Sequence, residues 1–169
     1  VDTIAKLATA VYTVADVKIK DVPRRPSAPF ITSTLQQEAS RRLRFTASRT
    51  MALAQQLYEG IALGKGEATG LITYMRTDSP RMAPSAVTEI RDYITSRYGP
   101  SYVPPKPYLY ASKGKFAQEA HEAIRPTSVA NTPEKVKPHL DAAQLKLYTL
   151  IWQRAVASQM AAAISEVTT

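Results

Sequence analysis

Residues 33–60 read STLQQEASRRLRFTASRTMALAQQLYEG, and this stretch predicts two helices joined by a tight turn. In the first helix, Leu35, Ala39 and Leu43 recur every four positions and form one apolar face. Ser33, with Gln36 three residues later, fits a capping box at the start of this helix. The sequence therefore predicts a helix that packs one side against a core.

The second predicted helix follows a turn at residues 44–48, where Thr46 or Ser48 is suited to cap it. Its inward residues are Leu53, Ala54 and Leu57, and Gly60 is a typical C-terminal stop. Two short helices joined in this way, with several arginines, resemble a helix-turn-helix unit. An ordinary helical hairpin with a charged outer face fits the same pattern.

The segments on either side predict further helices and a few strands. Residues 11–22 alternate apolar and polar side chains as a strand does, and Pro23, Pro26 and Pro29 then mark a linker. Residues 60–70 are glycine-rich and predict a flexible loop, while residues 71–75 predict an extended segment. The remaining expected elements are helices at 84–98 and about 116–124, a helix start at Thr132, a long helix after Asp141, and a strand after Met160. We therefore expect a mainly α protein with a minor β part.

The composition of the chain indicates which partners and which location to expect. The chain has 169 residues, no cysteine and a formal net charge of +8. A basic excess of this size favours a polyanion such as nucleic acid, although a solvated basic surface fits equally well on charge alone. We expect no membrane partner, because no apolar run is long enough to span a bilayer, and a cytoplasmic location. Val1 in place of an initiator methionine suggests that the chain is a fragment.

Tyr74 and Arg76 form the most suggestive chemical pair. A phenol oxygen can attack a phosphodiester and hold the broken end as a phosphotyrosine. A guanidinium two residues away in an extended segment points to the same side and can neutralise charge on the reacting phosphorus. Taken alone, this spacing fits a buried tyrosine beside a surface arginine better.

His121 lies in His-Glu-Ala-Ile-Arg, which lacks the second histidine of a zinc protease motif. We therefore predict no histidine metal site. A surface histidine on a helix is one interpretation. The other is a cation near a phosphate, with Arg125 as a second phosphate ligand one helical turn on.

Three segments together resemble the bacterial type IA DNA topoisomerases. They read PFITSTLQQ at 29–37 with AQQLYEG at 54–60, GLITYMRTDS at 70–79, and QEAHEAIRPT at 118–127. Their order and spacing also match, as does LYTLIW at 147–152. The resemblance covers roughly residue 23 to the end of the chain.

The resemblance implies catalytic roles for Tyr74, Arg76 and His121. Tyr74 would attack one DNA strand and become linked to its 5′-phosphate, Arg76 would assist cleavage, and His121 would support the same site. Four residues would bind DNA or its phosphates: Arg125, Thr77, Asp78 and Ser79. We also predict that Asp78 pairs with His121, directly or through water, and keeps the imidazole cationic.

The resemblance also implies an arrangement of domains. Residues 34–138 would form the helical tyrosine-bearing domain with its helix-turn-helix-like portion. Residues 1–33 and 139–169 would be strips of a β-rich gate domain. The Mg²⁺ of the parent enzyme would bind to acidic residues of a further domain, so we expect no metal ligand in this chain. The expected partners are single-stranded DNA and the remaining domains of the parent enzyme.

Two other functions fit part of the sequence. A non-enzymatic helix-turn-helix DNA-binding module would explain the helix pair and the charge, but not the GLITYMRTDS run. The topoisomerase part of a reverse gyrase would share the tyrosine motif. Met75 and the His-Glu-Ala-Ile-Arg-Pro run favour bacterial topoisomerase I.

Overall fold

The computed structural model describes residues 2–64, 66, 68–111 and 121–169, and divides the chain into two compact units. The smaller unit combines Val1–Arg24 with Ala163–Thr169, and the larger unit is Arg25–Ala162. These divisions differ from the predicted boundaries at residues 34 and 138, and α6 (Ala142–Ala157) belongs to the larger unit. That the terminal strips belong to a gate domain stays a prediction.

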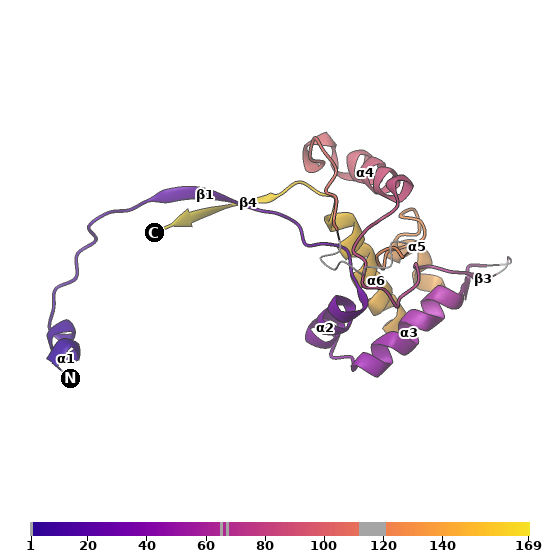
Figure 1. The fold of residues 1–169 in the computed structure, drawn as a ribbon, viewed down its shortest axis with the longest axis horizontal. Coiled ribbons are helices and arrows are strands. Elements are labelled where there is room, and N and C mark those ends of the chain that lie inside the picture. Colours follow the sequence, from indigo (N-terminus) through magenta and orange to yellow (C-terminus); the bar gives the residue numbers. More distant parts are fainter. Residues whose placement is uncertain (1, 65, 67, 112–120) are drawn as a thin grey trace. The chain divides into compact units, whose positions relative to one another are not determined.

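The smaller unit contains a helix and a two-stranded sheet (Figure 1). Helix α1 spans Asp2–Ala8, and strand β1 (Ile19–Arg24) pairs antiparallel with β4 (Ala163–Thr168). The strand expected after Met160 is confirmed, whereas the strand expected over 11–22 begins only at Ile19. Pro23 lies within β1 rather than ending it, which a two-stranded sheet allows because each strand has a free edge.

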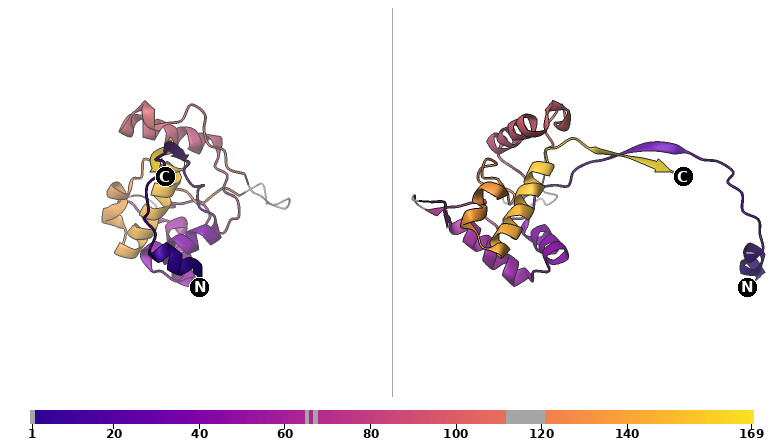
Figure 2. Two further views of the ribbon diagram at one scale, coloured as in Figure 1. Left: turned by 90° about the vertical axis from the view of Figure 1, so that its left-hand side faces the viewer. Right: turned by 180° about the vertical axis from the view of Figure 1, so that it is seen from behind.

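The larger unit is a cluster of helices around α6, and Figure 2 shows α6 running through its middle. The other helices are α2 (Thr32–Leu43), α3 (Ala47–Glu59), α4 (Pro84–Tyr98) and α5 (Pro133–Val136), and each packs against α6. Short 3-10 turns lie at Pro100–Tyr102 and Lys137–His139. Helix α6 buries seven side chains: Leu147, Tyr148, Leu150, Ile151, Trp152, Ala155 and Val156. The mainly α class with a minor β part is confirmed.

Most predicted helix boundaries match because their capping residues act as expected. Thr46 accepts the Arg49 N–H at the start of α3, and Asp141 accepts the Ala143 and Gln144 N–H groups at the start of α6. The capping box at Ser33 is wrong. The N-cap residue of α2 is Ile31, two residues earlier than Ser33, and the Thr34 hydroxyl accepts the Ile31 N–H.

Two other predictions need correction. The loop over 60–70 contains a small hairpin, in which β2 (Ile61–Ala62) pairs with β3 (Ala68–Thr69). The helix expected over 116–124 does not form at His121–Ile124, where the backbone is extended and Ile124 bridges to Phe30. Residues 116–120 lie outside the described residues. His121 and Arg125 are therefore not one helical turn apart.

Candidate active site

Tyr74 lies on a segment without regular secondary structure, bent at Met75 and Arg76, whose residues alternate between buried and exposed. Met75, Thr77 and Ser79 are buried, whereas Tyr74, Arg76 and Asp78 are exposed. Tyr74 itself is 38% exposed. Tyr74 and Arg76 are thus both accessible to solvent, and that they act together on one phosphate stays a prediction.

Thr73 fixes the backbone before the tyrosine. Its N–H donates to the Arg125 carbonyl oxygen (2.9 Å), and its hydroxyl donates to the Ala123 carbonyl oxygen (2.6 Å). The same hydroxyl accepts the Arg125 N–H at 3.0 Å. These bonds join the tyrosine segment to the segment that contains His121.

Thr32 fixes the backbone after the tyrosine. Its N–H donates to the Thr77 carbonyl oxygen, and its hydroxyl accepts the Thr77 N–H, both at 2.9 Å. The Met75 carbonyl oxygen lies 2.8 Å from that hydroxyl. The first turn of α2 is therefore bonded directly to the segment that carries Arg76.

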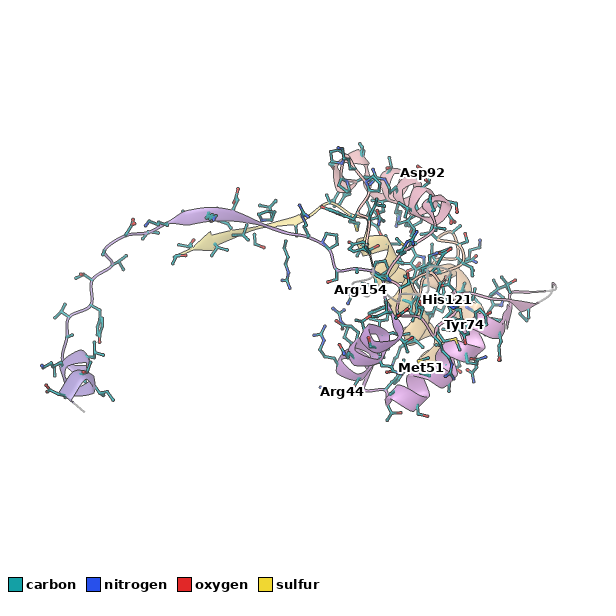
Figure 3. The ribbon with its side chains drawn as sticks, viewed as in Figure 1. Arg44, Met51, Tyr74, Asp92, His121 and Arg154 are labelled. Carbon is teal, nitrogen blue, oxygen red and sulfur yellow. The ribbon has the colours of Figure 1, made fainter. Side chains whose placement is uncertain are left out.

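The Tyr74 ring lies close to two other rings. The Tyr58 ring meets it at 5.3 Å between centroids in an edge-to-face arrangement, and the His121 ring lies 6.0 Å away at a tilt of 33°. Figure 3 shows Tyr74 and His121 next to each other. Sequence reasoning expected His121 here but assigned no role to Tyr58, since nothing in the spacing of α3 indicates which ring meets the nucleophile.

A cleft of about 490 Å³ opens beside His121, and neither Tyr74 nor Tyr58 is among the residues that line it. Its lining is formed by Ile31, Thr32, Ser33, Arg76, Thr77, Asp78 and His121. Arg76 and the N-terminus of α2 both favour an anion there. Sequence reasoning missed Thr32 and Ser33, although both lie within the PFITSTLQQ run.

Asp78 and His121 line this cleft together, yet within the described part of the chain no hydrogen bond or ion pair joins them. A direct bond between the two side chains is therefore absent from this structure. The arrangement in which one water bridges them stays a prediction.

Arg125 and Ser79 are not among the residues that line the cleft. The Arg125 guanidinium donates to Glu122 (2.7 Å) and to the Pro126 carbonyl oxygen (2.9 Å). Burial acts to raise the pKa of Glu122, but the hydrogen bond and charge of Arg125 outweigh it and hold that pKa below its ordinary value. Phosphate binding by Arg125 and Ser79 stays a prediction, as it does for Thr77, whose hydroxyl accepts the Ser79 N–H.

The described residues contain no cluster of side chains suited to bind a metal ion. Within them, no group of three or more histidine, aspartate or glutamate side chains is placed to hold an ion. Asp78 is the one carboxylate that lines the cleft in this part of the chain. The described residues form no such cluster, and that the ligands of Mg²⁺ lie outside this chain stays a prediction. No helix in the described residues is long and apolar enough to cross a bilayer.

Comparison with known proteins gives one consistent result. The family model described as DNA topoisomerase matches residues 1–169. DNA topoisomerase 1 of Xylella fastidiosa (strain 9a5c) is 57% identical over 155 residues, which is 92% of this chain and 19% of that protein. DNA topoisomerase 1 of Rickettsia prowazekii (strain Madrid E) is 50% identical over 159 residues, or 94% of this chain and 20% of that protein.

A solved structure agrees with the sequence matches. Full-length topoisomerase I from Thermotoga maritima superposes with a TM-score of 0.82 and 42% identity, covering 99% of this chain and 26% of that one. The chain thus spans about a fifth of the length of the curated relatives it matches. Its family follows from the full-length match and from these identities: the chain belongs to the bacterial DNA topoisomerase I family.

Proposed function

We propose that the protein containing this chain relaxes negatively supercoiled DNA by cutting one strand transiently and passing another through the break. Tyr74 is the proposed nucleophile. The observation that carries the proposal is the position of this exposed phenol. Its ring lies 6.0 Å from the His121 ring, and His121 and Arg76 line the same cleft. The similar curated proteins are named DNA topoisomerase 1, which supports the same reading.

The proposed reaction is a transesterification. The Tyr74 oxygen attacks a backbone phosphorus, an O–P bond forms, and the bond from phosphorus to the 3′ oxygen breaks. The tyrosine then carries the 5′-phosphate, and the 3′ oxygen leaves as a hydroxyl after taking a proton. Religation reverses these steps, so no external energy source is required.

Arg76 and His121 would act on the charge of the reacting phosphate. Negative charge builds on the phosphate oxygens in the transition state, and a guanidinium in the cleft stabilises it. His121 lies close enough to the Tyr74 ring to contact the same phosphate. Asp78 would support His121 through a water.

Other parts of the protein would complete the proposed site. We propose that Mg²⁺ and its acidic ligands come from another domain and that single-stranded DNA is the substrate. Removing one preorganised charge contact typically costs about 3–4 kcal/mol of transition-state stabilisation. We therefore expect no covalent adduct when the isolated chain is incubated with DNA and Mg²⁺. The proposed location is the cytoplasm, in association with the nucleoid.

The test is adduct formation by the full-length protein carrying this segment. End-labelled single-stranded DNA is incubated with Mg²⁺ and the protein is then denatured, so that labelled protein reports the covalent link. Tyr74→Phe should abolish the label while leaving the fold intact, because it removes one exposed hydroxyl. Tyr98→Phe is the matched control, since Tyr98 is similarly exposed (45%) on α4. An adduct formed by Tyr74→Phe would refute the assignment.

A non-enzymatic DNA-binding role has one observation in its favour. Helices α2 and α3 form a compact pair, and the exposed arginines on it are Arg41, Arg42, Arg44 and Arg49. In that case the full-length protein would bind DNA without forming any adduct. The same labelling experiment separates the two functions.

A further inference from the structure

We infer that the Thr32 hydroxyl is a positioning group for Arg76, through the backbone on either side of that arginine. This inference rests on the proposed function, because the reaction of Tyr74 is what Arg76 would serve. Thr32 itself does not need to touch DNA. It acts by holding the loop between Met75 and Thr77 in one conformation.

The hydroxyl contacts the backbone on both sides of Arg76. It lies 2.8 Å from the Met75 carbonyl oxygen and 3.0 Å from the Thr77 carbonyl oxygen, and it accepts the Thr77 N–H at 2.9 Å. One hydroxyl hydrogen is thus shared between two carbonyls while the oxygen lone pairs receive an N–H. The residue between those two backbone groups is Arg76.

Burial makes these contacts hard to replace. Met75 is 1% exposed and Thr77 is 7% exposed, and the hydrogen bonds that their backbone groups make with Thr32 are partly buried. A buried polar group left without a partner is strongly destabilising, and the loop would move to recover one. Any such movement carries Arg76 with it, because that side chain projects from the middle of the loop.

Thr73 does not duplicate this role. Its hydroxyl bonds to the segment holding Ala123 and Arg125, on the other side of Tyr74. The nucleophile thus has an anchor that does not depend on Thr32. Loss of the Thr32 hydroxyl should therefore displace Arg76 more than Tyr74, and it should weaken phosphate stabilisation while the phenol stays in place.

The experiment measures the single-turnover rate of adduct formation by the full-length protein carrying this segment. Thr32→Val keeps the shape and removes the hydroxyl, and we expect cleavage to slow by about tenfold or more, since small displacements of catalytic groups have effects of this size. Thr32→Ser restores the hydroxyl and should recover most of the rate. Thr34→Val is the matched control, because its hydroxyl lies in the same helical turn but bonds to Ile31. That variant should lose some stability and keep its cleavage rate.

A double-mutant cycle tests whether Thr32 acts through Arg76. In an Arg76→Ala background, Thr32→Val should slow cleavage by less than about twofold, because the positioned group is already gone. An equally large loss in both backgrounds would overturn the inference. So would a wild-type rate in Thr32→Val, provided that the unaltered protein forms the adduct. Absence of an adduct from the unaltered protein would instead refute the proposed function.

Folding is checked by thermal unfolding of each variant. If Thr32→Val unfolds below the assay temperature, Thr32→Cys replaces it, because a thiol is a weaker donor of similar size. A cysteine variant that cleaves at the wild-type rate would overturn the inference. A Thr32→Cys change that slows the otherwise unaltered protein, but slows the Arg76→Ala protein by less than about twofold, would support it.

Discussion

The rings of Tyr74 and His121 lie 6.0 Å apart between centroids, with their planes tilted by 33°. The two residues come from separate segments outside the helices, which Thr73 joins through its bonds to Ala123 and Arg125. The segment that carries the imidazole is thus joined to the segment that carries the phenol by hydrogen bonds of the Thr73 hydroxyl. The contribution of His121 to the rate of cleavage can therefore be tested by a substitution that leaves Tyr74 unchanged.

We predict that His121→Ala slows adduct formation without abolishing it. Loss of one preorganised group near a reacting phosphate reduces the rate by about a hundredfold. The measurement is single-turnover cleavage of labelled DNA by the full-length protein carrying this segment. His139→Ala is the control, because this second histidine lies in the 3-10 turn Lys137–His139, away from the cleft. Equal rates for the two variants would remove His121 from the site.

The Glu122–Arg125 ion pair should make the stability of the purified chain sensitive to acid. Arg125 holds the pKa of Glu122 below its ordinary value of 4.5, in spite of burial, which acts to raise it. The folded state therefore favours the charged carboxylate. The resulting stability is fully present above pH 4.5 and is lost as the pH falls through the lowered pKa.

The corresponding variant is Glu122→Gln. We expect it to be less stable than the unaltered chain at pH 7 by about 1 kcal/mol, a modest value because the carboxylate is partly exposed. The difference should shrink as the pH falls below 4.5. Urea unfolding between pH 3 and pH 7 measures it. A difference that does not change with pH would show that the ion pair contributes nothing to stability.

Gly70→Ala should destabilise the chain. A Cβ atom at Gly70 would lie 2.7 Å from the Tyr58 carbonyl oxygen, so the backbone must move to admit it. Such overpacking costs about 1–3 kcal/mol, which thermal unfolding can detect. Gly66→Ala is the matched control, because nothing lies within 4 Å of its added Cβ. If the two variants have the same melting temperature, the close approach of Gly70 to the Tyr58 carbonyl oxygen is incorrect.

Binding of the purified chain to single-stranded DNA should weaken as salt is added. The formal net charge of +8 supplies the attraction. If the chain neutralises three or four phosphates, log K should fall against log salt with a slope of about −2 to −3. Fluorescence anisotropy with a labelled oligonucleotide measures this slope. A flat response would mean that the positive charge is merely a solvated surface.

Sequence reasoning predicted the helices well because their signals are local. Pro84 and Gly99 bound α4 as expected, and Thr46 and Asp141 cap the helices that follow them. Each of these signals acts within one helical turn, so it can be read without knowing the rest of the fold. The alternation of exposed and buried residues from Tyr74 to Ser79 likewise involves only neighbouring residues.

The remaining features depend on contacts between distant residues. Thr32 and Tyr58 reach the tyrosine segment only after α2 and α3 have packed, and no spacing in the sequence encodes their distances. The segment at His121–Ile124 has a helical composition but is extended, because its backbone bonds to Phe30 and Arg81 instead of to itself. Tertiary hydrogen bonds therefore override the local preference there.

The two threonine anchors have a mechanical consequence. Under the proposed mechanism, a DNA end attached to Tyr74 would transmit any tension in the strand to this short segment. Thr73 would pass part of that load to the backbone at Arg125, and Thr32 would pass part to the start of α2. A force in either direction along the segment would thus be resisted by the hydrogen bonds of Thr73 or Thr32 before it reached the flanking chain. The attachment point could swing with the whole helical unit while its own local geometry stayed fixed, ready for the strand to be resealed.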